Sequence, residues 1–409
     1  MFAFSGPGFL VAVGYMDPGN WATDLAGASR FGYALLWVVV LSGAMAMLLQ
    51  ALSLRLGIVT GRDLAQHCRD AYPRPIVLGL WLLSEVAIVA CDVAEVIGTA
   101  IALQLLFGVP LILGVVLTVV DVLGLLALQR RGSRRLEAVI IGLLALVAGC
   151  FAVEIVLSRP ALEPLAAGLV PSATMWRDPD MLYIAIGIVG ATVMLHSLYL
   201  HSTLAQARRS QLAERSTRAA LRFATADSTI ALLLAMLVNC AILVVAAAVF
   251  HANGRTDIAE IEDAYRLLTP ILGTPFAAAL FGLALLAAGQ NASITATMAG
   301  QVVMEGFVDI RLPLWLRRLV TRALAIIPVI AIVAWSGEHG TARLLVLSQV
   351  VLSLQLPFAL LPLLQFTASR ARMGCFVNPA WLTGAAVAIT TFIVLINVTL
   401  IADYALAPA

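Results

Sequence analysis

The chain has 409 residues, of which 62% are hydrophobic and only 12% are charged, and its formal net charge is +2. Soluble globular domains carry about 25% charged residues, so the composition excludes a soluble enzyme, and the small charge gives no reason to expect a nucleic-acid partner. We predict an all-α polytopic membrane protein embedded in the lipid bilayer. Its five cysteines are scattered without metal-ligand spacing, so we interpret them as small apolar residues. We expect no bound cofactor.

Apolar runs long enough to cross a bilayer recur eleven times along the chain. We place them near residues 5–28, 33–56, 75–106, 110–128, 135–158, 179–207, 218–250, 271–306, 315–335, 341–367 and 379–403.

Arginine clusters occupy the even-numbered connections between these spans, and the chain contains no lysine. They are Arg55, Arg62, Arg69 and Arg74, then Arg130, Arg131, Arg134 and Arg135, then Arg208, Arg209, Arg215, Arg218 and Arg222, then Arg311, Arg317 and Arg318, and finally Arg370 and Arg372. Because cytoplasmic loops are rich in Arg and Lys, the N-terminus is predicted to lie inside and the C-terminus outside.

The first span is interrupted by Asp17-Pro18-Gly19-Asn20. A carboxylate at mid-membrane depth costs at least ~2.5 kcal/mol, so it is usually functional. Pro18 and Gly19 break the helix and free backbone carbonyls, which a bilayer tolerates only where they line a cavity. A broken helix with a buried carboxylate and amide is how transporters build cation sites.

A second interruption is predicted in the sixth span, within residues 187–196, with Gly190 as the residue that breaks the helix. The two interrupted spans are five helices apart, which favours two five-helix halves of opposite topology with a site between them. Residues 1–158 would form the first half and 179–367 the second, while 379–403 would be an eleventh helix outside the repeat.

The two interrupted spans supply a mixed set of candidate metal ligands. Asp17 and Asn20 offer hard oxygens, Met194 offers a soft thioether, and Ala191 could offer a freed carbonyl. An added sulfur biases a site from Mg²⁺ or Ca²⁺ toward transition metals. A lone Met in an apolar helix is otherwise a packing residue, and Asp17 could instead form a structural ion pair.

The third span carries Glu85, Asp92 and Glu95, which spread over about 80° of one helix face. A stripe of three carboxylates in an apolar helix indicates a proton relay, although a static salt-bridge network remains an alternative. His196 and His201 add groups that titrate near neutral pH; His201 could equally be a satisfied interior histidine. The possible counter-charges, or simple positive-inside anchors, are Arg208, Arg317 and Arg318.

The motifs together resemble the NRAMP family of divalent-metal transporters, of the bacterial MntH type. The resemblance covers essentially the whole chain. It rests on Asp17-Pro18-Gly19-Asn20, on residues 190–202 (GATVMLHSLYLHS), 92–98 (DVAEVIG), 289–291 (GQN), 300–307 (GQVVMEGF), 315–319 (WLRRL) and 348–353 (SQVVLS).

The resemblance implies a LeuT-like fold with broken helices 1 and 6 in the plasma membrane of a bacterium. It implies that Asp17, Asn20, the Ala191 carbonyl and Met194 bind the metal, and that Gln349 joins in some conformations. It also implies that the carboxylates of the third span form a separate proton path together with the two histidines and three arginines named above.

Two residues depart from the family pattern, which usually has Pro at Leu195 and Asn at Ser197. Pro helps keep the sixth helix open, so Leu195 is expected to allow more helix, which puts the Ala191 carbonyl in doubt more than the Met194 sulfur.

These observations predict a monomeric importer of Mn²⁺, and also of Fe²⁺ and Cd²⁺, driven by protons without nucleotide. Three alternatives stay open at this point: an amino-acid or organic-solute symporter on the same fold, a transport-impaired metal-binding sensor, and an oxygen-only Mg²⁺ carrier.

Overall fold

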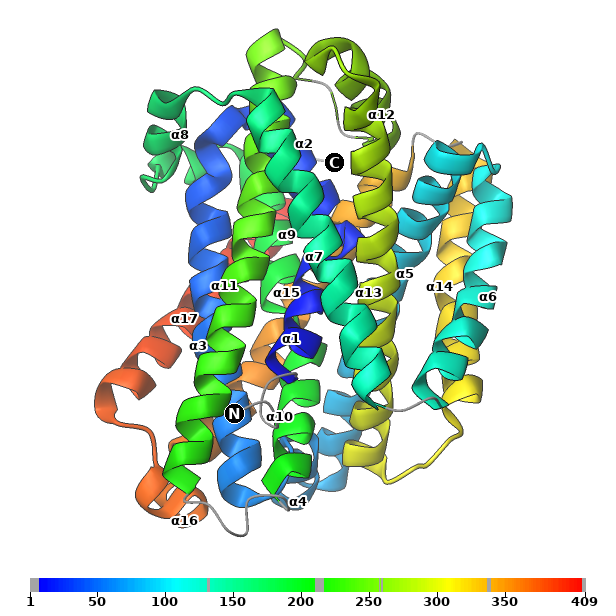
Figure 1. Ribbon diagram of the computed structural model, residues 1–409. Coiled ribbons are helices and arrows are strands. Elements are labelled where there is room, and N and C mark those ends of the chain that lie inside the picture. The colour runs from blue at the N-terminus through cyan, green and yellow to red at the C-terminus, as the bar shows by residue number, and fades with distance from the viewer. Residues whose placement is uncertain are drawn as a thin grey trace.

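The computed structural model describes residues 7–130, 133–209, 217–256, 258, 260–336 and 340–406. Within these ranges the regular structure is entirely helical, and the long helices run side by side in a bundle (Figure 1). This arrangement agrees with the all-α membrane protein predicted from composition.

Among the described residues, nine long helices make up most of the bundle. They are α3 (Leu36–Thr60), α5 (Arg74–Phe107), α6 (Leu111–Arg130), α7 (Ser133–Ser158), α11 (Thr217–Val249), α13 (Pro275–Val308), α14 (Leu314–Ser336), α15 (Thr341–Thr367) and α17 (Ala380–Leu406). Two further spans are each divided into halves: α1 (Pro7–Ala12) with α2 (Pro18–Phe31), and α9 (Pro179–Val193) with α10 (Leu195–Arg209).

Four short helices lie in the connections at the two ends of the bundle (Figure 1). They are α4 (Leu64–Ala71), α8 (Leu162–Gly168), α12 (Ile261–Leu272) and α16 (Arg370–Met373).

Nine stretches of the described chain are long and apolar enough to cross a membrane. The first of them, Pro18–Thr60, joins two of the eleven predicted spans because α2 and α3 follow one another through a 3-10 turn. The fourth predicted span contributes the shorter apolar stretch Leu111–Val120. The helices therefore correspond to the eleven predicted spans. Only nine stretches are counted because α2 and α3 are joined into one and the apolar part of α6 falls among the shorter helices.

Local sequence explains where several helices begin and end. Asp178 caps α9 by accepting backbone N–H groups, and Pro179 follows at the first helical position, where its missing N–H is not needed. Gly61 and Gly108 end α3 and α5 with φ of +72° and +69°, the left-handed conformation in which glycine closes a helix.

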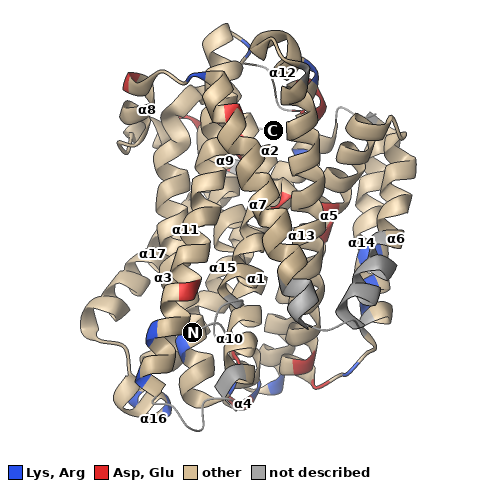
Figure 2. Ribbon diagram, viewed as in Figure 1, with Lys and Arg blue, Asp and Glu red and all other residues tan. Residues whose placement is uncertain are grey.

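The half-helices lie in the middle of the bundle, where α15 packs on α9, α10 on α3, and α11 on α2. Figure 2 shows that charged residues gather mostly toward the two ends of the bundle. Beside the first break, the Trp21 ring packs edge-on against Phe151 and Phe281, with centroids 4.9 and 5.0 Å away. The fold therefore encloses the half-helix junctions in the protein interior.

Candidate metal site and the adjoining carboxylate–arginine cluster

The first break lies at Asp17, as predicted. The 3-10 turn Val13–Met16 precedes it, Asp17 itself is extended (φ −69°, ψ 162°), and Pro18 starts α2. Asp17 Oδ1 accepts hydrogen bonds from Asn20 N and Nδ2 at 2.9 and 2.8 Å. Its Oδ2 has no hydrogen-bond partner among the described residues, although the side chain is fully buried. Asp17 thus keeps a free oxygen and contacts no cationic side chain in the described structure.

The second break lies at Met194, inside the predicted interruption of residues 187–196, but the prediction that Gly190 is the residue that breaks the helix is wrong. Helix α9 continues through Gly190 and Ala191 to Val193, Met194 has φ 23° and ψ 103°, and α10 begins at Leu195. Gly190 has a different role, because a Cβ there would overlap the backbone oxygen of Gln349 on α15. The glycine permits close helix packing.

The two breaks meet through Asn20. Its Nδ2 donates to the Ala191 carbonyl at 3.2 Å, and its Oδ1 accepts from the Thr192 hydroxyl at 3.3 Å. Met194 is fully buried, and the Ser197 hydroxyl lies 3.9 Å from its sulfur. A Cβ added to Gly14, in the turn before Asp17, would lie 3.7 Å from that sulfur. Asp17, Asn20, Ala191 and Met194 therefore line one junction.

Gln349 reaches the same junction from α15. Its side chain is fully buried, and a Cβ on Gly19 would overlap its amide group. Gln349 Nε2 donates to Ser348 at 2.9 Å, while Oε1 has no hydrogen-bond partner in the described structure. Because Gly19 has no side chain, the amide group of Gln349 can approach the Asp17 turn closely.

The carboxylates of α5 all face α14. Arg318 forms ion pairs with Asp92 and with Glu95, the latter at 2.8 Å, and both carboxylates are fully buried. Arg322, which sequence reasoning did not select, lies 3.5 Å from Glu95, and both arginines donate to Ser293, at 2.6 and 2.7 Å. Two acids and two arginines therefore form one connected cluster.

Glu85 forms a second pair at one end of the same stripe. Arg317 donates to its carboxylate at 2.8 and 3.0 Å, and Trp81 Nε1 donates to it at 3.0 Å. Arg317 also donates to the Gly300 carbonyl. The side chain of the third predicted arginine, Arg208, lies outside the described residues.

His196 connects the metal-site junction to the carboxylate cluster through a cysteine. Its Nε2 lies 3.9 Å from Cys91 Sγ, and that sulfur lies 3.7 Å from Glu95 Oε1. His196 Nδ1 has no partner in the described structure. Cys91, which sequence reasoning treated as a small apolar residue, therefore lies between the ring and the acid.

His201 belongs to a different chain of hydrogen bonds. Its Nδ1 lies 2.9 Å from Gln50 Oε1, and Gln50 Nε2 donates to the Tyr15 hydroxyl at 2.6 Å. Asn239 donates to the Tyr15 carbonyl at 2.8 Å and to Asn20 Oδ1 at 3.3 Å. The described contacts thus direct His201 toward the first break rather than toward Glu95. Gln50 and Asn239 carried only the weak signal of polar residues in apolar spans.

Two further buried carboxylates were missed, Asp24 on α2 and Glu154 on α7. Both side chains are almost completely buried, at 1% and 0% exposure, and all four oxygens lack partners within the described structure. The rule that selected Asp17, an acid inside an apolar span, would also have selected these two residues.

Helix α4 closes one end of the junction, next to α10. Asp63 caps it, Leu64 N donates to Ser202 Oγ at 3.0 Å, and Arg372 lies 2.9 Å from His67 Nδ1. Burial, reinforced by the Arg372 charge, lowers the pKa of His67 to about 4, while burial raises the pKa of Asp63 to about 6.

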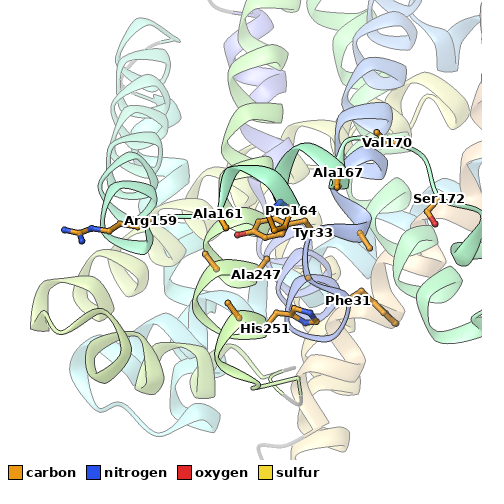
Figure 3. A pocket seen from close by; sticks show the side chains of 15 residues that line it. Phe31, Tyr33, Arg159, Ala161, Pro164, Ala167, Val170, Ser172, Ala247 and His251 are labelled. Carbon is orange, nitrogen blue, oxygen red and sulfur yellow. The ribbon is translucent and has the colours of Figure 1, made fainter.

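The outer groove drawn in Figure 3 lies away from this junction. It has a volume of about 640 Å³ and is lined by residues of the α2–α3 turn, the α8 region and the end of α11, among them Tyr33, Pro164 and His251. None of the five predicted ligands lines it, so cavity size does not identify the candidate site.

Comparison with known proteins places the chain in one family. The family model described as "Natural resistance-associated macrophage protein-like" (Nramp) matches residues 8–403. The divalent metal cation transporter MntH of Xanthomonas campestris pv. campestris is 57% identical over 406 residues, covering 99% of this chain and 91% of that protein. MntH of Bradyrhizobium diazoefficiens is also 57% identical, over 403 residues, covering 98% of this chain and 90% of that protein.

Solved structures agree with this placement. A crystal structure of the Eremococcus coleocola manganese transporter superposes with a TM-score of 0.89 at 42% identity, covering 100% of this chain and 88% of that one. Mhp1, a nucleobase-cation-symport-1 family transporter, matches with a TM-score of 0.65 at 16% identity, covering 98% of this chain and 91% of that one, and shows the fold alone.

The fold is that of a LeuT-like membrane transporter, not an enzyme. The chain belongs to the Nramp family.

Proposed function

We propose that this protein imports divalent transition-metal ions, Mn²⁺ foremost and also Fe²⁺ and Cd²⁺. Protons are the coupling ion, and no nucleotide is used. The observation that carries the proposal is Asp17: a fully buried carboxylate held by neutral donors, with one oxygen left free at the junction of two broken helices. The MntH relatives and the Eremococcus manganese transporter support the choice of cargo.

The donor set suits a transition metal. We assign oxygen ligands to Asp17, Asn20 and the Ala191 carbonyl, a sulfur ligand to Met194, and an additional amide oxygen to Gln349. Hard ions such as Mg²⁺ and Ca²⁺ prefer oxygen alone, whereas a thioether favours softer ions. Asn20 would need to turn its amide, because its Nδ2 now donates to both Asp17 and Ala191.

The departure at Leu195 is compatible with this assignment. Helix α9 runs past Ala191, in keeping with the expectation that Leu195 allows more helix, yet the chain still leaves the helical conformation at Met194. The Ala191 carbonyl accepts a hydrogen bond from Asn20 across the junction, which supports it as a ligand even without Pro at position 195.

Protons would follow a separate route through His196, Glu95 and Asp92 to Arg318. The contacts of His196 with Cys91, of Cys91 with Glu95, and of Arg318 with both acids support this route. Glu85 with Arg317 would continue it along α5 and α14. Since His201 bonds to Gln50, we assign it to the first break instead.

The proposed orientation has the N-terminus in the cytoplasm and the C-terminus outside the plasma membrane of a bacterium, because arginines fill the even connections. We also propose that residues 1–158 and 179–367 form the two inverted halves. The half-helices would rock between them to open the site to each side alternately.

Uptake by proteoliposomes tests the function. Wild-type protein should accumulate Mn²⁺ under an inward proton gradient and acidify the interior, and Asp17→Ala should do neither. Asp180→Asn, an exposed acid paired with Arg30, serves as the control and should behave as wild type. Mn²⁺ binding without flux would favour a sensor, and amino-acid flux without Mn²⁺ flux would favour the organic-solute reading.

A further inference from the structure

A second groove lies on the lateral surface of the bundle, where α3, α11 and α17 meet. It has a volume of about 680 Å³, and its lining includes Arg55 of α3, Arg222 of α11 and Trp381 of α17. All three helices are membrane spans, so the surrounding medium here is lipid rather than water.

The two charged residues of this groove and its tryptophan lie at one end. Arg55 is close to the end of α3, Arg222 close to the start of α11, and Trp381 at the start of α17. On α11 the lining continues through Ala226 to Ile230, which is about 12 Å farther along the helix at 1.5 Å per residue. The groove thus passes from two guanidinium groups and an indole to a mostly apolar wall, which also carries the hydroxyls of Thr225 and Thr229.

The two arginines differ in whether their guanidinium groups already have hydrogen-bond partners in the protein. Arg55 donates from Nε to the Phe376 carbonyl at 2.9 Å and from one terminal nitrogen to the Val377 carbonyl at 3.4 Å. Arg222 is exposed and makes no hydrogen bond or ion pair with any described residue. The described lining contains no acidic residue, and the nearest acid on α11, Asp227, accepts instead from Gly8 N of α1.

We propose that this groove binds an anionic phospholipid of the cytoplasmic leaflet. The headgroup phosphate would contact Arg222 and Arg55 beside Trp381, and one acyl chain would lie along Ala226 and Ile230 toward the bilayer centre. Basic pockets between membrane helices on the cytoplasmic side are suited to such headgroups, and Trp is favoured at the level where headgroup and chain meet. The choice of leaflet depends on the proposed orientation, but the binding site itself does not depend on transport.

Native mass spectrometry of the purified protein tests the proposal. The protein is equilibrated with equal amounts of phosphatidylglycerol and phosphatidylcholine of the same chains, and bound lipid is counted. Wild type should retain phosphatidylglycerol preferentially, and Arg222→Gln should lower that preference by about fivefold, the effect of one charge near a lipid surface.

Arg218→Gln is the matched control. Arg218 is also exposed and lies one turn earlier on α11, but it does not line the groove. The substitution therefore removes the same charge from the same end of the helix without changing the groove. It should leave the preference unchanged. An equal loss in Arg218→Gln, or no loss in Arg222→Gln, would overturn the site.

A third variant tests the apolar wall. Ala226→Trp fills the groove without altering charge and should expel the bound lipid while the protein remains folded by circular dichroism. Glycerol phosphate, which has the headgroup chemistry but no chains, should fail to compete; effective competition would mean that the apolar wall plays no part and would overturn the proposal. Because the measurement is binding alone, a failure of metal transport would not affect it.

Discussion

Two buried acidic regions of this protein differ in how their charge is balanced. Asp17 has one carboxylate, two hydrogen bonds from Asn20 and a free oxygen, with no cationic side chain in contact. Asp92 and Glu95, equally buried, are both paired with Arg318, and Glu95 also approaches Arg322. Of these two regions, only the one at Asp17 has no cationic side chain in the described structure that compensates its negative charge.

This difference indicates what each region is for. A buried carboxylate without a counter-charge is costly, and Asp17 differs from the other unpaired acids of the described structure, Asp24 and Glu154, in lying at the junction of two broken helices. A carboxylate paired with arginine is already neutralised, so a second cation gains little there, whereas a proton can still redistribute the pairing. The uncompensated site suits a metal cargo, and the compensated cluster suits the coupling ion.

The largest expected effect comes from breaking the compensated cluster. Arg318→Met would leave Asp92 and Glu95 without their shared partner, and removing one partner of a buried pair costs about 3–5 kcal/mol. The thermal midpoint of the purified protein should fall sharply. Arg62→Met, which breaks the exposed pair with Asp70, should shift it little. Equal midpoints for Arg318→Met and wild type would mean that the cluster is not a structural unit.

Removing the charge of Asp17 should preserve stability but weaken metal binding. Asp17→Asn deletes a buried charge that no described side chain neutralises, so stability should be kept or raised. Mn²⁺ affinity should fall at least ~100-fold, or about 2.7 kcal/mol. Calorimetric titration together with thermal unfolding checks both parts. A variant that unfolds readily while still binding Mn²⁺ would reverse the comparison.

The sulfur of Met194 should set selectivity rather than total affinity. In Met194→Ala the remaining proposed ligands are all oxygens, so Ca²⁺ and Mg²⁺ should compete better while Mn²⁺ uptake persists. Competition of each ion against radiolabelled Mn²⁺ measures this. Leu195→Ala, beside the same break, is the control. Continued exclusion of Ca²⁺ by Met194→Ala would remove the sulfur from the selectivity argument.

Cys91 should matter for coupling but not for metal binding. Cys91→Val removes the sulfur that lies between His196 and Glu95, so acidification per Mn²⁺ should fall while Mn²⁺ affinity is retained. Cys91→Ser keeps a hydrogen-bonding group and should couple better than Cys91→Val. Simultaneous flux and internal-pH recordings compare the two, and identical coupling ratios would exclude Cys91 from the route.

The smallest expected effect concerns His67, at the end of the bundle and outside the membrane spans. Its pKa is lowered to about 4 in the folded protein from an ordinary value near ~6.5, so unfolded chains bind more protons between these values. The resulting stability is present above pH ~6.5 and is lost as the pH falls toward 4. His67→Gln should lose less thermal stability between pH 7 and 5 than wild type does. An unchanged difference would argue against the lowered pKa, which burial and, second, the Arg372 charge give to His67.

Much of the fold could be predicted because hydropathy and positive-inside charge both report on the same spans. The Asp17 break was predictable because Pro18 and Gly19 mark it in the sequence. The position of the second break, at Met194, was not, because Val193, Met194 and Leu195 carry no helix-breaking signal. There the conformation depends on tertiary packing around Gly14, Ser197 and α15.

The carboxylate stripe of α5 was predictable from helical spacing, but its partners were not. Sequence spacing cannot distinguish Arg317, Arg318 and Arg322 as counter-charges, and only the packing of α14 on α5 assigns them to Glu85, Asp92 and Glu95. Cys91 and Gln50 likewise acquire a role only through neighbours from other helices. The acids could thus be found from the sequence of one helix, whereas the arginines that neutralise them are known only from the packing of two helices.

The most direct test separates the two regions in one assay. Mn²⁺ flux and internal acidification are recorded together in proteoliposomes containing wild type, Asp17→Asn or Glu95→Gln. Asp17→Asn should lose both signals, while Glu95→Gln should still move Mn²⁺ down its own gradient without acidification. Mn²⁺ flux through Asp17→Asn, or undiminished acidification by Glu95→Gln, would contradict the assignment of cargo to one region and coupling to the other.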